Sequence, residues 1–441
     1  MLKLINRIGN GGFGNVDLVE DDHGRRYARK TFSNNQPQAL PPSLVQNVTR
    51  RFVREAQVQE NISHNNIMPV YFSKLDEVPP WFLMPVAEST LENDLRKDKN
   101  LGGNALSAIS DILAGLEALH SIGITHRDLK PLNVLRLRNE HSSAYAISDF
   151  GLISLKDTQI SLLTQTGMRM GSDYYTAPEI TADLRHASPM SDIFSVGCIL
   201  HDIFGTGDRI PCAEIVDDGP YSDIMRCCTR RDPARRFQTV EDLRDAIMQI
   251  GHSAAPVHEA QIANLIGLLQ SDLQLDIKNW KNIVEKIEDE SGSQDIKTLL
   301  SIISLPRIEE VIQISLPIAC RLGIEYAKWV KNGSFIFAEC DAIANRLSRF
   351  FSAGDIECRT EVLLAYLMMG TSHNRWYVEE KFYNSCKADL DPGTANRLAL
   401  ELRVMGKPAC NLIEHLERSI KVSRQNLHPA ISSTLGKLCA C

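Results

Sequence analysis

The stretch H-R-D-L-K-P-L-N at residues 126–133 places a carboxylate, two cations and an amide within one short segment. Pro131 fixes its own φ and cannot continue a regular helix, so the sequence predicts a rigid loop here. In such a loop Asp128 could accept a proton from a hydroxyl, Lys130 could neutralise a phosphoryl group, and Asn133 could offer an oxygen to a divalent metal. An H-R-D tripeptide alone also fits a surface ion pair, so its meaning depends on the rest of the chain.

Length and composition limit the class of protein. The chain has 441 residues, 43% hydrophobic and 23% charged, which is ordinary for a globular protein of two or three domains. Its formal charge of −7 lacks the basic excess of a dedicated nucleic-acid binder. The sequence shows no apolar run of about 18 residues and no secretion signal pattern. We therefore expect a cytoplasmic protein with no nucleic-acid and no membrane partner.

The 11 cysteines are scattered along the chain and do not form the paired C-x-x-C spacing of a zinc or redox site. In a chain without a secretion signal, a dispersed and odd-numbered set is typical of reduced thiols, most of them buried as small hydrophobic side chains. We expect free thiols.

A glycine-rich segment, I-G-N-G-G-F-G-N-V, occupies residues 8–16. Gly9, Gly11 and Gly14 have no Cβ, so the backbone can approach phosphates closely. Dinucleotide-binding domains carry the same G-x-G-x-x-G spacing, but there the glycines open a helix. Here Val16 begins a second strand, which predicts that the glycines form the tip of a hairpin. An ordinary glycine hairpin is the alternative until a phosphate-binding partner is found.

The stretch at residues 126–133 resembles the catalytic loop of protein kinases, H-R-D-x-K-x-x-N. On its motifs the chain is identified as a member of the eukaryotic-like (Hanks-type) serine/threonine protein kinases across residues 1–250. The motifs follow the kinase order: the glycine loop, Y-A-R-K at residues 27–30, the catalytic loop, S-D-F-G at 148–151 and T-A-P-E at 176–179.

The resemblance implies transfer of the γ-phosphoryl group of ATP to a protein hydroxyl. A lysine two positions after Asp128 is the pattern of serine/threonine kinases rather than tyrosine kinases, and Ser172 fits the same class. Asp128 is then the proton acceptor, and Lys130 and Lys30 offset the charge of the phosphates. Glu55, on a helix predicted at about residues 43–62, is expected to pair with Lys30.

The resemblance also implies a metal site, a nucleotide site and a structural frame. Asn133 and Asp149 are the expected ligands of Mg²⁺, with Mn²⁺ as an alternative. The expected ATP-binding residues are Ile8, Gly9, Gly11, Gly14, Val16, Ala28, Lys30, Met84, Pro85 and Ala87. The expected structural residues are Arg127, Glu179, Asp192 and Arg236.

Kinases with an arginine before the catalytic aspartate can use a phosphorylated activation loop to order the site. Thr164 and Thr166 are the first candidates for such a phosphate, which would pair with Arg127, and Ser161 and Thr158 come next. An unmodified polar loop is the equally weighted alternative.

The resemblance predicts an α+β bilobal protein-kinase fold, with a β-rich N-lobe at about residues 1–86 and a helical C-lobe at about 87–250. Residues 251–258 read as a linker. Residues 259–441 show helical periodicity between turn signals, which predicts an all-α domain, either a helical-repeat solenoid or a compact bundle. From its position we expect this domain to dock a protein substrate or partner, or to be autoinhibitory.

Two other functions compete with an active serine/threonine kinase that also phosphorylates itself. A pseudokinase scaffold would bind nucleotide or a partner without turnover, but such proteins usually lose the equivalents of Lys30, Asp128 or Asp149, and none is lost here. A small-molecule phosphotransferase related to aminoglycoside kinases shares an H-x-D loop, but it predicts neither the glycine loop nor the A-P-E segment. The catalytic domain beginning at residue 1 favours a bacterial cytosolic kinase.

Overall fold

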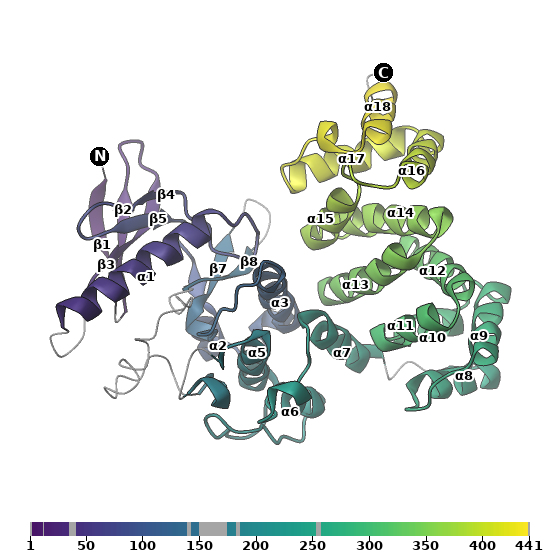
Figure 1. The fold of residues 1–441 in the computed structure, drawn as a ribbon, viewed down its shortest axis with the longest axis horizontal. Helices are drawn as coiled ribbons and strands as arrows, with labels where there is room; N and C mark the ends of the chain where they lie inside the picture. Colours follow the sequence, from purple (N-terminus) through teal and green to yellow (C-terminus); the bar gives the residue numbers. More distant parts are fainter. Residues whose placement is uncertain are drawn as a thin grey trace. The chain divides into compact units, whose positions relative to one another are not determined.

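The computed structural model describes residues 2–11, 13–34, 41–138, 143–149, 174–181, 186–252 and 257–439. The chain folds as two compact units, Met1–Leu243 and Arg244–Cys441 (Figure 1). We describe each unit by itself. Among the described helices, none combines the length and the apolar character that a membrane span requires.

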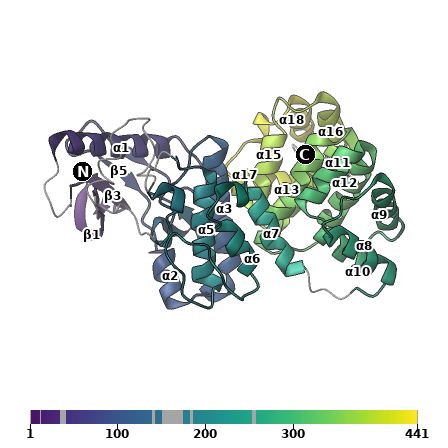
Figure 2. The same cartoon turned by 60° about the horizontal axis from the view of Figure 1, so that its bottom comes forward.

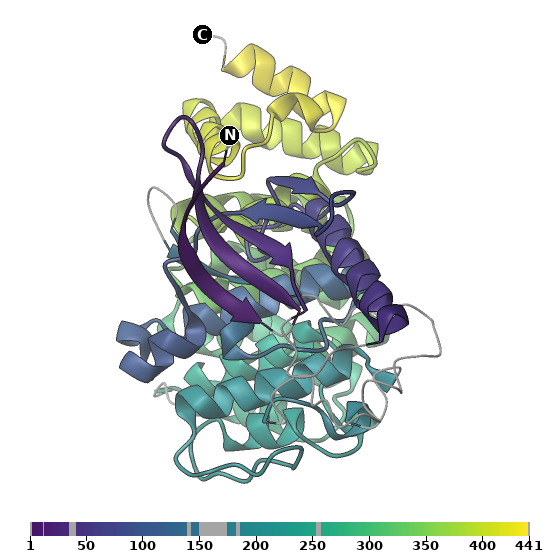
Figure 3. The same cartoon turned by 90° about the vertical axis from the view of Figure 1, so that its left-hand side faces the viewer.

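Unit 1 begins with an antiparallel five-stranded sheet in the order β1-β2-β3-β5-β4 (Figure 3). The strands are β1 (Lys3–Gly11), β2 (Gly14–Glu20), β3 (Arg26–Phe32), β4 (Phe72–Lys74) and β5 (Trp81–Met84). The register pairs Gly11 with Gly14 and Gly9 with Val16, so the glycine-rich segment closes the β1–β2 hairpin. A second strand therefore follows the glycines, as the sequence predicts.

Helix α1 (Pro42–Glu60) packs one face against this sheet. Its buried positions follow the i, i+3, i+4, i+7 spacing of one helix face: Phe52, Glu55, Ala56 and Gln59. Phe52 lies with its ring centroid 5.5 Å from that of Phe82 on β5. The same apolar face that docks the helix therefore carries the carboxylate of Glu55 toward the sheet.

The remainder of unit 1 is mainly helical. Its helices are α2 (Leu91–Lys97), α3 (Ala105–Ser121), α5 (Pro189–Phe204), α6 (Ser222–Cys228) and the start of α7 (Val240–His252). A small sheet of β6 (Ser89–Thr90), β7 (Val134–Arg138) and β8 (Ser143–Ile147) accompanies them. Helix α5 is buried along nearly its whole length and packs between α3 and α6 (Figure 2). The predicted order of a β-rich lobe followed by a helical lobe is confirmed.

Unit 2 begins within α7, and its described residues form helices without any strand, which confirms the predicted all-α region. Its further helices are α8 (Ala260–Gln270), α9 (Ile277–Asp289), α10 (Gln294–Ile302), α11 (Leu305–Ile314), α12 (Leu316–Lys331), α13 (Phe337–Ala353), α14 (Ile356–Ser372), α15 (Trp376–Ser385), α16 (Pro392–Met405), α17 (Lys407–Ser419) and α18 (Pro429–Leu438). Helix α12 packs on α9, α11, α13 and α14, and α14 packs in turn on α15, α16 and α17. This succession of neighbours is the arrangement of a helical-repeat stack (Figure 1).

Buried charge pairs join the helices of this stack. Arg346 on α13 is fully buried, and its Nε lies 2.6 Å from Oδ1 of Asp245 on α7. The second carboxylate oxygen of Asp245 accepts the backbone N–H of Leu305 at 3.0 Å, at the start of α11. A second such pair joins α13 to the start of α15: Nη2 of Arg375 lies 2.6 Å from Oδ2 of the fully buried Asp341. Because each charge is paired and hydrogen-bonded, its burial is tolerated.

One expectation about the cysteines is wrong. Cys410 on α17 and Cys439 at the end of α18 form a disulfide, with their Cα atoms 5.6 Å apart. The other eight cysteines among the described residues are free thiols. The pairing depends on α18 folding back on α17, and across a sequence separation of 29 residues the sequence gives no signal of that contact.

Removing one member of the Arg346–Asp245 pair should destabilise unit 2 strongly. We expect Arg346→Ala to lower the free energy of unfolding by about 3–5 kcal/mol, because it leaves the buried carboxylate of Asp245 uncompensated. The matched control is Arg349→Ala on the same helix, since Arg349 pairs with the half-exposed Glu309 and such pairs contribute about 0–1 kcal/mol. Urea denaturation followed by circular dichroism measures both. Equal losses for the two variants would contradict this account.

Candidate active site

A buried carboxylate holds the predicted catalytic loop. Asp192, on α5, is fully buried. Its Oδ2 accepts the backbone N–H of His126 at 2.8 Å, and its Oδ1 accepts that of Arg127 at 2.8 Å. Arg127 has φ of 71°, a left-handed conformation that is strained for a residue with a side chain. The two charge-assisted hydrogen bonds stabilise this strained turn and so fix the start of the loop.

Within the loop, three functional side chains converge. The Nζ of Lys130 lies 2.7 Å from Oδ2 of Asp128. The Nδ2 of Asn133 donates to the backbone carbonyl of Asp128 at 2.8 Å and to its Oδ2 at 3.1 Å. Pro131 begins the short 3-10 turn η2 (Pro131–Asn133) that brings Asn133 back to Asp128. Because the amide nitrogen of Asn133 faces Asp128, its oxygen remains as the atom that could ligate a metal.

Asp149 is joined to this loop through Ser148. The ring Nε2 of His126 lies 2.9 Å from the carbonyl of Ser148, and the N–H of Ser148 donates to the carbonyl of Asn133 at 2.9 Å. Asp149 itself has φ of 65°, a second strained non-glycine residue in the site. The end of β8 is therefore hydrogen-bonded to the catalytic loop at two points.

Lys30 links the sheet, helix α1 and Asp149. Its Nζ lies 2.9 Å from Oε1 of Glu55 and also contacts the carboxylate of Asp149. Burial alone would lower the pKa of Lys30, but Asp149 and Glu55 outweigh burial and raise it above its ordinary value. At Glu55 burial is the larger effect and raises the pKa of the carboxyl. At Asp149 the Lys30 ammonium outweighs burial and lowers the pKa of the carboxyl. The ammonium is therefore firmly protonated beside two carboxyl groups.

Four of the expected nucleotide-binding residues, Ala28, Met84, Val16 and Ala87, lie in or against one apolar cluster. Ala28 on β3 pairs in register with Met84 on β5, and both are buried. Val16 and Ala87 pack against this cluster, and so does Leu135 on β7. Ile8, Gly9, Gly11 and Gly14 lie on the β1–β2 hairpin, and Pro85 follows β5. Leu135 was missed from the sequence, although an apolar residue two positions after Asn133 is a usable signal.

The donor set suits the expected metal. The carboxylate of Asp149 and the amide oxygen of Asn133 are hard oxygen donors, and Mg²⁺ usually takes one or two protein ligands together with phosphates and water. Within the described residues, no three His, Cys, Asp or Glu side chains group to form a protein-only metal site. The expected phosphorylation sites Thr164 and Thr166, and Ser172, lie outside the described residues.

The A-P-E glutamate is held by an arginine far along the chain. Arg236 donates from Nη1 to Oε1 and from Nη2 to Oε2 of Glu179, both at 2.8 Å. Its guanidinium also lies over the ring of Phe194 on α5, 5.0 Å from the centroid. Ser191 Oγ donates to the same carboxylate at 2.8 Å. The end of the segment that carries Glu179 is thus fixed to α5.

Comparison with known proteins now decides the family. The protein kinase domain matches residues 2–250, more than half of the 441-residue chain. The chain belongs to the protein kinase family. This finding and the bacterial relatives confirm the resemblance to Hanks-type serine/threonine kinases.

Three curated relatives are bacterial kinases. Serine/threonine-protein kinase PknL of Mycobacterium tuberculosis is 29% identical over 209 residues, covering 42% of this chain and 51% of PknL. PksC of Streptomyces coelicolor is 28% identical over 287 residues, covering 58% of this chain and 50% of PksC. The probable kinase PknB of Lactococcus lactis is 32% identical over 210 residues, covering 46% and 31%. The kinase therefore spans about half or less of the length of these relatives.

A solved structure is also similar, at a lower level. The kinase domain of Mycobacterium tuberculosis PknI shares 19% identity and aligns with a TM-score of 0.40. The alignment covers 56% of this kinase and 95% of the PknI chain.

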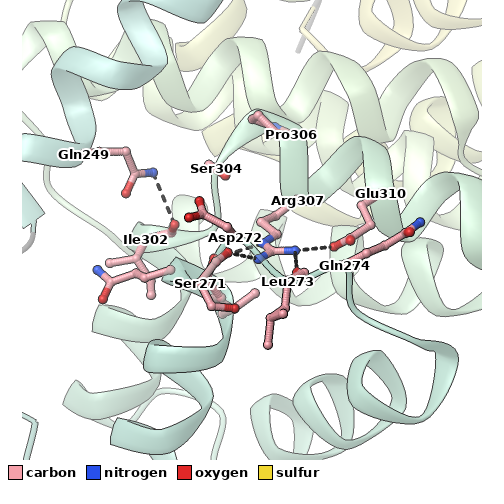
Figure 4. Close-up of a pocket in the computed structure, with 12 residues that line it drawn as sticks. Gln249, Ser271, Asp272, Leu273, Gln274, Ile302, Ser304, Pro306, Arg307 and Glu310 are labelled. Atoms are coloured by element: carbon pink, nitrogen blue, oxygen red, sulfur yellow. Dashed lines mark hydrogen bonds and ion pairs between the residues drawn. The ribbon is translucent and has the colours of Figure 1, made fainter. Parts of the chain in front are cut away.

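A separate cavity of about 610 Å³ lies in unit 2, between the α8–α9 connection and the start of α11 (Figure 4). Arg307 lines this cavity and donates to the backbone carbonyls of Leu269 and Leu273 at 2.9 Å and to Glu310 at 2.8 Å. Glu310 in turn accepts the N–H of Leu275 at 2.9 Å. These bonds anchor the connection, so Arg307 has a structural role in this cavity.

The Glu179–Arg236 pair should give a measurable pH dependence. Burial would raise the pKa of Glu179, but Arg236 outweighs burial and lowers it below the ordinary 4.5. A lowered folded-state pKa adds stability that is fully present above 4.5 and is lost as the pH falls through the folded value. We expect Glu179→Gln to be less stable than wild type at pH 7, with the gap closing below pH 4.5.

Thermal unfolding between pH 3 and pH 8 measures this gap. The matched control is Glu92→Gln, since Glu92 forms an exposed pair with Arg96 on α2. A gap of constant size across the whole range would contradict the assigned role of Glu179.

Proposed function

We propose that this kinase is an ATP- and Mg²⁺-dependent serine/threonine protein kinase that transfers the γ-phosphoryl group of ATP to protein hydroxyls and phosphorylates itself. The observation that supports this most is the convergence of Asp128, Lys130 and Asn133 in a loop held by Asp192, with Asp149 joined to the same loop. The loop brings together a carboxylate, a cation and an amide oxygen, and such a positioned frame is what phosphoryl transfer mainly needs.

The roles follow from the contacts. Asp128 orients the acceptor hydroxyl and takes its proton as the oxygen forms a bond to the γ-phosphorus, while the bond from that phosphorus to the β–γ bridging oxygen breaks and ADP leaves. Lys130, 2.7 Å from Asp128, lies where it offsets charge on the transferring group. Lys30 is held by Glu55 and binds the phosphates of the nucleotide. When bound, Mg²⁺ would supply charge neutralisation between the phosphates, with Asn133 and Asp149 as its ligands.

The assignment of Asp128 as the proton acceptor predicts a slower phosphoryl transfer when its carboxylate is replaced. We expect Asp128→Asn to transfer phosphate from labelled ATP about 10²–10⁴-fold more slowly than wild type, because an amide cannot accept the hydroxyl proton. Autophosphorylation and phosphorylation of myelin basic protein measure the rate. The matched control is Asp223→Asn, because that carboxylate is 87% exposed and pairs with Arg226 on the same helix, α6.

Two outcomes would count against the proposal. A wild-type protein that binds ATP and transfers no phosphate to itself or to the acceptor would favour a nucleotide-binding scaffold. Wild-type rates in Asp128→Asn would show that another group accepts the proton.

A further inference from the structure

A carboxyl group is buried between three helices of unit 2. Glu379, on α15, has no exposed surface. A Cβ at Gly370 on α14 would come within 2.9 Å of its Cγ, so this glycine leaves room for the buried side chain. The Oε2 of Glu379 accepts the hydroxyl of Ser419 at 2.6 Å, and its Oε1 lies 3.1 Å from Nε2 of His415. One carboxyl group thus joins α15 to two side chains of α17.

The surroundings of this contact disfavour charge on either partner. Within the part of the chain that the structure describes, neither Oε1 of Glu379 nor Nε2 of His415 makes an aligned hydrogen bond, although both atoms are buried. The carboxyl group of Glu380, next along α15, acts on Glu379. The guanidinium of Arg418, on α17, acts on His415. A neighbouring anion therefore opposes ionisation of the carboxyl, and a neighbouring cation opposes protonation of the imidazole.

Burial sets the protonation state of the pair. It raises the pKa of Glu379 to about 7, while the Ser419 hydroxyl opposes the rise in part and Glu380 adds to it. Burial, and then Arg418, lowers the pKa of His415 below its ordinary 6.5. Just below pH 7 the carboxyl therefore holds a proton and the imidazole is uncharged.

We propose that the contact of Glu379 with His415 and Ser419 is a proton-sensitive fastening of α17 to the helical stack. With the proton on Glu379, the contact buries no net charge. Loss of the proton leaves a fully buried carboxylate with one hydroxyl donor and, among the described side chains, no paired cation, which is costly. Helix α17 is therefore held less firmly as the pH rises to neutral.

Hydrogen exchange along α17 in the full chain tests this proposal. A folded-state pKa above the ordinary 4.5 means that the closed contact keeps its proton at a pH where the opened one has lost it, so opening becomes easier as the pH rises from 4.5 to 7. We expect the opening equilibrium of α17 in wild type, relative to that in Glu379→Gln, to rise by up to about tenfold per pH unit, to about 10²-fold, and to level off above pH 7. Exchange rates between pH 5 and pH 8, corrected for their intrinsic pH dependence, measure this ratio. The comparison cancels the contribution of Glu380, whose pKa burial also raises to about 7.

A second variant separates charge from packing. Ser419→Ala removes the hydroxyl that favours the carboxylate form of Glu379, so we expect the pH at which opening levels off to move above the wild-type value. A purely structural loss would ease opening equally at every pH.

The matched control is Glu417→Gln on the same helix. Arg424 lowers the pKa of Glu417 below its ordinary 4.5, the opposite direction to that of Glu379. This control should open more readily than wild type, by a factor that stays constant above pH 6.

Two results would overturn the inference. One is a ratio of wild type to Glu379→Gln that does not change with pH while both proteins are folded. The other is a levelling point in Ser419→Ala equal to that of wild type, because the titrating group would then not be the carboxyl that Ser419 contacts. Neither result involves phosphoryl transfer, so both would leave the proposed kinase function intact.

Discussion

The buried carboxylate of Asp192 is the interaction on which the rest of the site depends. It accepts two backbone N–H groups from the start of the catalytic loop, one of them from Arg127 in a strained left-handed conformation. A carboxylate at zero exposure is costly unless its oxygens are well satisfied, and here both are. The two hydrogen bonds offset both the cost of burying the Asp192 carboxylate and the cost of the strain at Arg127, which favours one conformation of the loop. Asp128, Lys130 and Asn133 take their positions from that conformation.

Helix α5, which carries Asp192, holds two motifs of the site in fixed positions relative to each other. From α5, Asp192 fixes the catalytic loop, while Ser191 and Ser195 fix the segment that contains Glu179. The part of the site formed by the sheet and α1 is held differently, through the protonated amine of Lys30. Lys30 is bonded to Glu55 on α1 and to Asp149 at the end of β8, so it joins the sheet to the catalytic loop by charge. Nucleotide phosphates that approach Lys30 meet a cation whose partners already keep it protonated.

Much of this arrangement is predictable from the sequence. The rest is not, because it depends on contacts between segments that are far apart in the chain. The hairpin at the glycines follows from a strand pattern after Val16, and the buried face of α1 follows from helical spacing, which places Glu55 inward. The Glu179–Arg236 pair spans 57 residues, so only the family resemblance suggests it. The Cys410–Cys439 disulfide and the Arg346–Asp245 pair have no motif, because each depends on how separate helices pack. Leu135 was not predicted because an apolar residue in a strand is typical of any core position, and the sequence does not show which side chains it contacts.

The most direct test of this account is the turnover of Asp192→Asn. An asparagine keeps the shape of the side chain but has a single acceptor oxygen, so one of the two backbone N–H groups in the catalytic loop loses its partner. The account predicts a folded protein whose kcat falls by about 10²-fold or more while the KM for ATP changes little, because the misplaced loop affects the chemical step and leaves the nucleotide contacts in place. A folded Asp192→Asn variant with wild-type kcat would contradict the account.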